Sequence, residues 1–254
     1  MSEVTSTPPT GTPTWIELGV PDVARAREFY RALFGWEYGP EDGPEDGYTL
    51  CLRRGRPVAG LYHDPAPSGR WRMYFATDDC DASAKRVVDA GGTLVREPLD
   101  IGAPGRWAIA VDPSGAEFGL WQGRARLGCE LVYEPGTLVR NDLVAPDPAP
   151  ARAFYPAVFD YTLDGNDDLP DADFTFLRRP DGHEIGGIMG VAAAAAASWG
   201  TLFGTEDADA AAARTVAAGG TAEEPRDTFY ARMATLTDPF GTVFEVGAVP
   251  EGGL

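Results

Sequence analysis

The nine residues Thr14–Asp22, TWIELGVPD, recur 125 positions later as Val139–Asp147, VRNDLVAPD. The first copy leads to the pair Phe29-Tyr30, and the second leads to Phe154-Tyr155 at the same offset. Alternating apolar and polar residues after Thr14 predict a half-buried strand, and the Pro-Asp that follows predicts the start of a helix. The chain therefore contains two similar segments, each opening with a strand and then a helix.

The similarity continues along most of the chain, which indicates a duplicated domain. Gly91-Gly92-Thr93 matches Gly219-Gly220-Thr221 at an offset of 128, and Asp112–Gly115 matches Asp238–Gly241 at 126. Small drifts of the offset are expected, because loops tolerate insertions. A repeat of this length predicts two domains, residues 12–125 and 136–249. They are joined by a linker at 126–135 and flanked by a flexible tail at 1–11 and a short one at 250–254.

Each domain contains the same order of elements twice. In the first domain we expect, from the residue patterns, strands at 15–20, 48–53, 58–62, 72–77, 93–97, 107–112 and 117–122, and helices at 23–34 and 82–90. Turn-rich residues fill 41–47. The Ala-rich run 191–197 corresponds to the Pro-rich loop 63–69, so we expect it to connect two units. The chain thus consists of four strand–helix–three-strand units.

The composition excludes several classes of partner. The 254 residues carry 39 acidic and 21 basic side chains, a net charge of −18, which repels nucleic acid and anionic membranes. Three cysteines do not suggest a disulfide framework, and no apolar run approaches the roughly 20 residues of a membrane helix. The first residues show no signal-peptide pattern. We therefore expect a cytoplasmic monomer or homodimer that binds a small molecule.

The repeated motifs resemble those of the vicinal oxygen chelate superfamily, which includes glyoxalase I, bleomycin-resistance proteins, fosfomycin-resistance enzymes and extradiol dioxygenases. The resemblance rests on Leu18–Asp22 before Phe29-Tyr30, on Asp112–Gly115 before Phe118, and on their second copies. It implies an α+β fold of two tandem domains, each a pair of βαβββ units whose mixed sheet forms a ligand-binding cup. The tandem form is similar to the two-domain actinobacterial branch labelled glyoxalase-like or "hydroxylase".

The resemblance also implies where a metal ion would bind in metal-dependent members. Alignment on these motifs places the three ligand positions of each cup at Trp15, Arg72 and Gly119 in the first domain. In the second domain it places them at Arg140, Gly200 and Glu245. Of these, Glu245 alone has a side chain that binds metal ions. The two histidines, His63 and His183, fall in predicted loops. We therefore expect no metal and no other cofactor.

Aromatic side chains dominate the first cup that this mapping predicts. Residues two apart on a strand share a face, so the mapped positions bring their neighbours into the cup. The predicted set has aromatic walls and two polar groups: Trp15, Tyr74, Trp121, Glu17 and Arg72. Such walls suit a flat or aromatic small molecule. The alternative is that Glu17 and Arg72 only pair with each other in a cup that binds nothing.

The second cup is predicted to be more polar. Arg140, Asp142 and Glu245 face it, Tyr230 lies at its rim, and aromatic residues are fewer. Here the alternative is that Arg140 pairs with Asp142 or Glu245 and leaves no binding site. The Phe-Tyr pairs of both domains lie at core spacing on their helices, so we expect them to be packing residues.

Three functions stay open at this point. The first is a metal-independent enzyme that isomerises, eliminates or cyclises an aromatic or polyketide-type natural product, with Glu17 as proton acceptor and Arg72 stabilising oxyanion charge. The second is a protein that sequesters an antibiotic or escorts an intermediate without catalysis, as bleomycin-resistance relatives do. The third is a scaffold without a ligand. The juxtaposition of Glu17 and Arg72 favours the first function and the high acidity favours binding of a cation, so neither feature decides between the first two.

Overall fold

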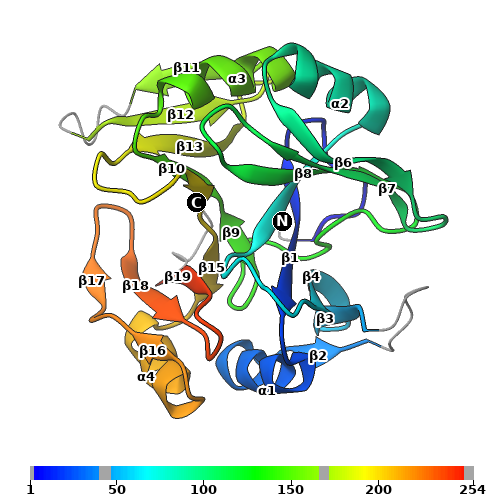
Figure 1. Ribbon diagram of the computed structural model, residues 1–254. Helices are drawn as coiled ribbons and strands as arrows, with labels where there is room; N and C mark the ends of the chain where they lie inside the picture. Colours follow the sequence, from blue (N-terminus) through cyan, green and yellow to red (C-terminus); the bar gives the residue numbers. More distant parts are fainter. Residues whose placement is uncertain (1–2, 40–46, 166–171, 249–254) are drawn as a thin grey trace.

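A computed structural model describes residues 3–39, 47–165 and 172–248 (Figure 1). Most of the turn-rich stretch predicted at 41–47 and the C-terminal tail lie outside these residues. The first domain contains β1 (Pro13–Val20), α1 (Val23–Phe34), β2 (Glu37–Tyr38), β3 (Thr49–Arg53), β4 (Arg56–His63), β5 (Arg72–Ala76), α2 (Cys80–Asp89), β6 (Thr93–Asp100), β7 (Gly105–Val111) and β8 (Glu117–Gly123). The predicted elements are thus present, with ends that differ by a few residues.

One mixed sheet runs through the first domain in the order β2-β3-β4-β1-β5-β8-β7-β6. Strand β1 pairs in parallel with β4 of its own unit and antiparallel with β5 of the next unit. The pair β1–β5 therefore joins the two units edge to edge. It also places the cross-strand partners of Trp15 and Glu17 on the second unit.

The second domain repeats this plan with a break in its central strands. Its elements are β9 (Leu138–Arg140), β10 (Asp142–Ala145), α3 (Ala149–Phe159), β11 (Thr162–Gly165), β12 (Phe174–Arg178), β13 (Glu184–Gly190), β14 (Ser198–Trp199), β15 (Leu202–Thr205), α4 (Ala208–Ala217), β16 (Thr221–Ala222), β17 (Arg226–Asp227), β18 (Arg232–Thr237) and β19 (Val243–Ala248). The counterpart of β1 is divided at Asn141 into β9 and β10. As a result, the strands form two sheets, β11-β12-β13-β10-β14 and β16-β18-β19-β15-β9.

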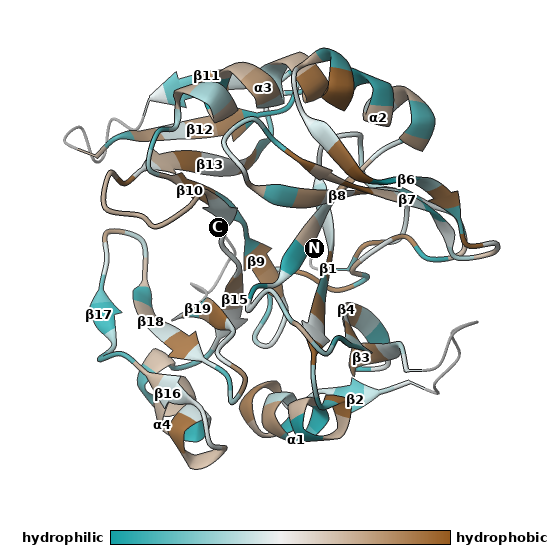
Figure 2. Cartoon of the chain, viewed as in Figure 1, coloured by the Kyte–Doolittle hydropathy of each residue, from teal (hydrophilic) through white to brown (hydrophobic). Residues whose placement is uncertain are grey.

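Local signals explain where the first helix begins and ends. The Asp22 carboxylate accepts a hydrogen bond from the Arg25 amide at 2.9 Å, which caps the start of α1. Gly35 ends the helix in the left-handed region at φ 69°, where a glycine is favoured. Between these ends both hydrophobic and hydrophilic residues occur on α1, as expected of a helix with one buried face (Figure 2).

The two domains pack through reciprocal contacts about a pseudo-twofold axis. Helix α1 lies beside α4, and α2 lies beside α3 (Figure 1). The Tyr30 hydroxyl donates to Asp238 of the other domain at 3.0 Å, and the Tyr155 hydroxyl donates to Asp112 at 2.9 Å. All four residues are buried. The Phe-Tyr pairs are therefore packing residues, as predicted, and their tyrosines connect one domain to the other.

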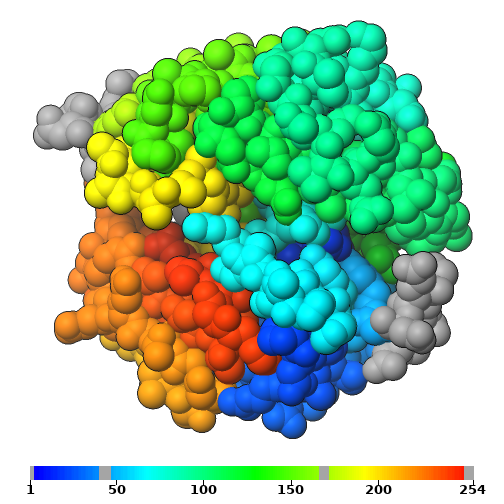
Figure 3. All heavy atoms as spheres, in the orientation of Figure 1, coloured from blue at the N-terminus to red at the C-terminus, as the bar shows by residue number. Residues whose placement is uncertain are grey.

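Two segments join the domains outside these helices. The connection at 63–70 lies against the second domain (Figure 3), where the Arg70 guanidinium donates to the Ser198 hydroxyl at 2.6 Å. The expectation of a flexible N-terminal tail is wrong from Glu3 onward. Glu3 forms a β-bridge with Leu131, and the Val4 amide donates to the Glu130 carbonyl at 3.0 Å, so the segment is held along the linker. No helix among the described residues is long and apolar enough to cross a membrane.

Candidate functional site

Glu17 lies at the centre of a hydrogen-bonded cluster in the first cup. Strand β1 pairs Glu17 with Arg72 and Trp15 with Tyr74 across the β1–β5 ladder. Glu17 Oε1 accepts from Arg72 Nη1 at 2.9 Å and from the Tyr74 hydroxyl at 2.6 Å, while Oε2 accepts from the Tyr48 hydroxyl at 3.1 Å. The structure therefore brings the predicted carboxylate and guanidinium into direct contact.

Arg72 extends this cluster toward the outside of the cup. Its Nη1 also donates to the Tyr62 hydroxyl at 3.1 Å, and its Nε donates to Glu117 Oε1 at 2.6 Å. Side-chain exposure rises along the row, from 13% at Glu17 to 19% at Arg72 and 40% at Glu117. Burial alone lowers the pKa of Arg72, but nearby Tyr74, Tyr62 and Glu17 raise it above its ordinary value. Arg72 is therefore a permanent cation at the mouth of the cluster.

The three predicted aromatic walls are present but almost fully covered by protein. Trp15, Tyr74 and Trp121 are all buried. The Trp15 indole donates to the Tyr48 hydroxyl at 3.0 Å, and the Trp121 indole donates to the Arg126 carbonyl at 3.1 Å. Trp15 thus supports the cluster through Tyr48, Tyr74 belongs to the cluster, and none of the three rings presents an open wall to the cup.

Two tyrosines of the cluster were missed by the sequence mapping. A Cβ on Gly60 would lie 2.1 Å from the Tyr48 hydroxyl oxygen, so glycine is required where that side chain crosses the sheet. Burial raises the pKa of Tyr48 and, less strongly, of Tyr62, so both phenols stay protonated at neutral pH. The mapping followed only the strands that carry metal ligands in relatives. The parallel partner of Glu17 is Gly60, and alternation from it could have identified Tyr62.

The polar residues of the second cup form a different cluster, which is centred on Arg140. Arg140 Nε donates to both carboxylate oxygens of Asp142 at 2.8 and 2.9 Å, and its Nη1 donates to Glu184. The predicted pair with Asp142 is present, whereas Glu245 accepts from Arg226 on β17 and not from Arg140. Sequence reasoning missed Glu184, which opens β13, the parallel partner of the strand that carries Asp142.

The second cup also holds more aromatic side chains than expected. The guanidinium of Arg140 lies 5.9 Å from the Phe174 ring centre and 5.6 Å from that of Phe176. Both rings are half-buried, and they come from β12, which the mapping did not include. Beyond them, Tyr230 packs edge-on against Phe229, whose side chain is 65% exposed. The second cup therefore holds two rings, Phe174 and Phe176, that the sequence mapping did not identify.

The metal positions of the superfamily do not fit a metal ion in this chain. Five of the six mapped residues lack a ligating side chain, and the sixth, Glu245, is held by Arg226. Across the described residues, no three His, Cys, Asp or Glu side chains gather as a metal site. His63 ends β4, exposed to solvent, and His183 lies in the β12–β13 turn. The histidines are thus not part of the two clusters just described.

The comparisons with known proteins agree with the duplicated architecture. The family described as "Glyoxalase-like domain" matches twice, over residues 15–121 and 139–247. The chain is 38% identical over 246 residues to a "Putative glyoxylase CFP32" of Mycobacterium tuberculosis, covering 93% of this chain and 94% of that one. It is 36% identical over 266 residues to the "Anthracycline biosynthesis protein DnrV" of Streptomyces peucetius, covering 95% and 94%.

Solved structures share the fold at low sequence identity. The Mn(II)-bound glyoxalase from Novosphingobium aromaticivorans has a TM-score of 0.68 at 18% identity, covering 98% of this chain and 83% of that one. The 2,3-dioxygenase LapB from Pseudomonas sp. KL28 has a TM-score of 0.66 at 17% identity, covering 96% and 94%. The chain belongs to the glyoxalase-like domain family, with one copy of the domain in each half.

Proposed function

We propose that this protein is a metal-independent enzyme that acts on an aromatic or polyketide-type natural product in its first cup. The observation that carries the proposal is the Glu17 carboxylate, held 2.9 Å from the Arg72 guanidinium among protonated phenols. The substrate class is supported by relatives named for anthracycline biosynthesis in two Streptomyces strains.

The cluster is suited to moving a proton next to a carbonyl group. A carboxylate oxygen has two acceptor sites, and Glu17 Oε2 accepts one hydrogen bond among the described residues, from Tyr48. Its second site would take a proton from a substrate carbon that is brought against this side chain, which is 13% exposed. Arg72 and the Tyr62 hydroxyl, which lie together at the outer end of the cluster, stabilise the negative oxygen of the resulting enolate. Return of the proton from Glu17 to another carbon completes an isomerisation.

The second cup supports a second candidate, binding without catalysis. Its central cation, Arg140, is held between the carboxylates of Asp142 and Glu184. The partly exposed rings around it offer apolar contact area, as in a protein that sequesters or escorts an aromatic molecule. In that case the first cup plays a structural role only.

The Glu17→Gln variant separates the two candidates, because it keeps the shape of the side chain and removes its charge. A thermal-shift screen of aromatic natural products, followed by product analysis of each hit, identifies the compound to use. We expect turnover of that compound to fall by about 10²- to 10⁴-fold while its binding survives. Turnover by the unmodified protein should also survive dialysis against a chelator.

Asp142→Asn is the matched control, since Asp142 occupies the position of Glu17 in the repeat. We expect it to leave turnover unchanged. If Glu17→Gln changes nothing and Asp142→Asn abolishes binding and turnover, the working site is the second cup. If the unmodified protein binds its hits and converts none of them, the binding function replaces the catalytic one.

A further inference from the structure

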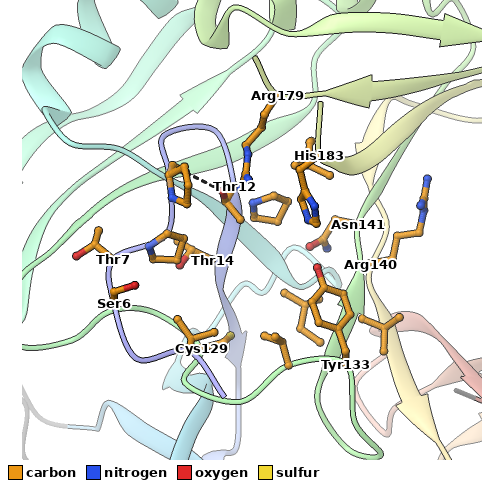
Figure 4. A pocket seen from close by; sticks show the side chains of 18 of the residues that line it. Ser6, Thr7, Thr12, Thr14, Cys129, Tyr133, Arg140, Asn141, Arg179 and His183 are labelled. Atoms are coloured by element: carbon orange, nitrogen blue, oxygen red, sulfur yellow. Dashed lines mark hydrogen bonds between the residues drawn. The ribbon is translucent and has the colours of Figure 1, made fainter. Parts of the chain in front are cut away.

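A cavity of about 300 Å³ lies between the N-terminal segment, the linker and the second domain (Figure 4). It does not include the Glu17 cluster. Its apolar lining comes from all three parts of the chain: Pro8, Pro9, Pro13, Val132, Leu138 and Ile185. Three polar side chains, Tyr133, Asn141 and His183, point toward one another across it (Figure 4). The rest of the lining is largely polar, so the cavity offers both apolar walls and hydrogen-bonding groups to a small molecule.

Asn141 supplies the first sign that a ligand group is expected here. In the repeat, Asn141 is the equivalent of Ile16 of the first domain, and both residues are buried. Asn141 Nδ2 donates to the Gly200 carbonyl at 2.9 Å and to the Thr201 hydroxyl at 3.1 Å, which bridges the strand break. Its Oδ1 is buried and accepts no hydrogen bond from any residue that the structure describes. Since buried polar atoms are almost always paired, this oxygen is an acceptor that a donor group from a ligand can satisfy.

Tyr133 supplies a second, independent sign. Its backbone lies in the left-handed region at φ 59°, which is uncommon for a residue other than glycine. This conformation directs the ring into the cavity, with the hydroxyl toward Asn141 and His183 (Figure 4). Partial burial raises the pKa of Tyr133, so its hydroxyl stays protonated and can donate at neutral pH. A donor and an acceptor thus face the same space.

The two arginines of the lining do not require an anionic ligand. Arg179 is paired with Asp181 and also donates to the Thr12 hydroxyl. The guanidinium of Arg140 is held by Asp142 and Glu184 and points away from the cavity in Figure 4. Both charges are therefore balanced by carboxylates of the same domain.

We propose that this cavity binds a neutral ring compound that carries a hydroxyl group, such as a simple phenol. The ligand hydroxyl donates to Asn141 Oδ1 and accepts from the Tyr133 hydroxyl, since one hydroxyl can do both. The proline, valine, leucine and isoleucine side chains cover the ring. This site is separate from the first cup, so its test does not depend on the proposed reaction.

The test is a titration of the full chain with phenol and with toluene, which has a methyl group in place of the hydroxyl. Two-dimensional ¹H–¹⁵N NMR follows the backbone signals. We expect phenol to shift the signals of residues 131–133, 141 and 183 in a saturable way, and toluene to bind more weakly. Tyr133→Phe should weaken phenol binding about 2- to 12-fold, the worth of one hydrogen bond, and leave toluene unchanged.

A filling variant tests the cavity itself. Val132→Phe adds a ring inside the cavity and should abolish binding of both probes. Val95→Phe, at an exposed position on β6, adds the same ring elsewhere and should change nothing. Signals that shift only in the two cups, no saturable shift with phenol, or unaltered binding by Val132→Phe would each overturn the proposal.

Discussion

The two cups of this protein are built from corresponding strands, but the charged groups at their centres are opposite in sign. The first is centred on the carboxylate of Glu17 and the second on the guanidinium of Arg140. In the first, Tyr48 packs over Gly60, and its hydroxyl reaches the carboxylate of Glu17. In the second, Phe174 packs over Gly187 in the same way, but it has no hydroxyl and lies beside an arginine. The shared scaffold therefore fixes where side chains enter a cup and leaves their chemistry free to diverge.

The difference also concerns how each charge is balanced. Glu17 is bound by one cation and two phenols, so its charge is shared within a nearly closed cluster. Arg140 is bound by two carboxylates that are each about 30% exposed. Solvent can therefore compensate the second cluster after a substitution far more readily than the first.

The largest expected effect comes from removing the cation of the first cluster. Arg72→Met should lower the free energy of unfolding by about 2–4 kcal/mol, because Glu17 is left as a buried charge without its counterion. Arg140→Met is the matched change in the second cup and should cost roughly half as much. Urea unfolding measures both. Equal losses for the two variants would contradict the comparison.

An intermediate effect is expected where a ring crosses a glycine. A Cβ on Gly119 would lie 1.9 Å from the Tyr74 ring, so Gly119→Ala must displace that ring from Glu17. We expect a loss of about 1–3 kcal/mol in the free energy of unfolding. At Gly200 the nearest atom to a Cβ is 3.5 Å away, so Gly200→Ala should change it by less than about 1 kcal/mol. Thermal unfolding of the two variants distinguishes these outcomes.

The smallest expected effect is a difference in alkaline stability. Burial and the charge of Glu17 raise the pKa of Tyr48 well above its ordinary value, whereas unfolded tyrosines ionise near pH 10. The contribution of Tyr48 is therefore fully present below about pH 10 and is lost as the pH rises further. Above this pH, the free energy of unfolding should therefore fall less steeply with pH in Tyr48→Phe than in the unmodified chain. The difference in slope should be about 1.4 kcal/mol per pH unit.

Phe174→Leu is the control for this measurement, since the second cup has no phenol at that position. Its unfolding free energy should fall with pH above 10 as steeply as that of the unmodified chain. An unchanged slope in Tyr48→Phe would show that the first cluster opens before its phenols ionise.

The fold could be predicted largely because the duplication presents each signal twice. The helix predicted over 23–34 is present as α1, with its cap at Asp22 and its end at Gly35. The break at Asn141 could not be predicted, because it depends on hydrogen bonds to Gly200 and Thr201, some 60 residues away. The held N-terminal segment was missed for the same reason, since its partners lie in the linker.

The candidate site could be predicted only along the strands where alternation was followed. The contact between Glu17 and Arg72 follows from their cross-strand register, and it is present. Tyr48 was missed because the mapping did not follow the strand predicted over 48–53, and in the structure it lies just before β3. Glu184 and Arg226 contact Arg140 and Glu245 from strands that are not paired with those of their partners. Local sequence patterns do not predict such contacts.

The crossed contacts Tyr30–Asp238 and Tyr155–Asp112 have a consequence for how such a chain arose. Each pairs the helix tyrosine of one repeat with the turn aspartate of the other, so a single surface patch meets its own copy. That reciprocity defines an isologous interface, the kind found in twofold homodimers. A half-length ancestor could satisfy both bonds by self-association, with its Tyr30 meeting the Asp112 of a second subunit. Fusion of two such subunits into one chain would leave the two cups free to differ, as they do here.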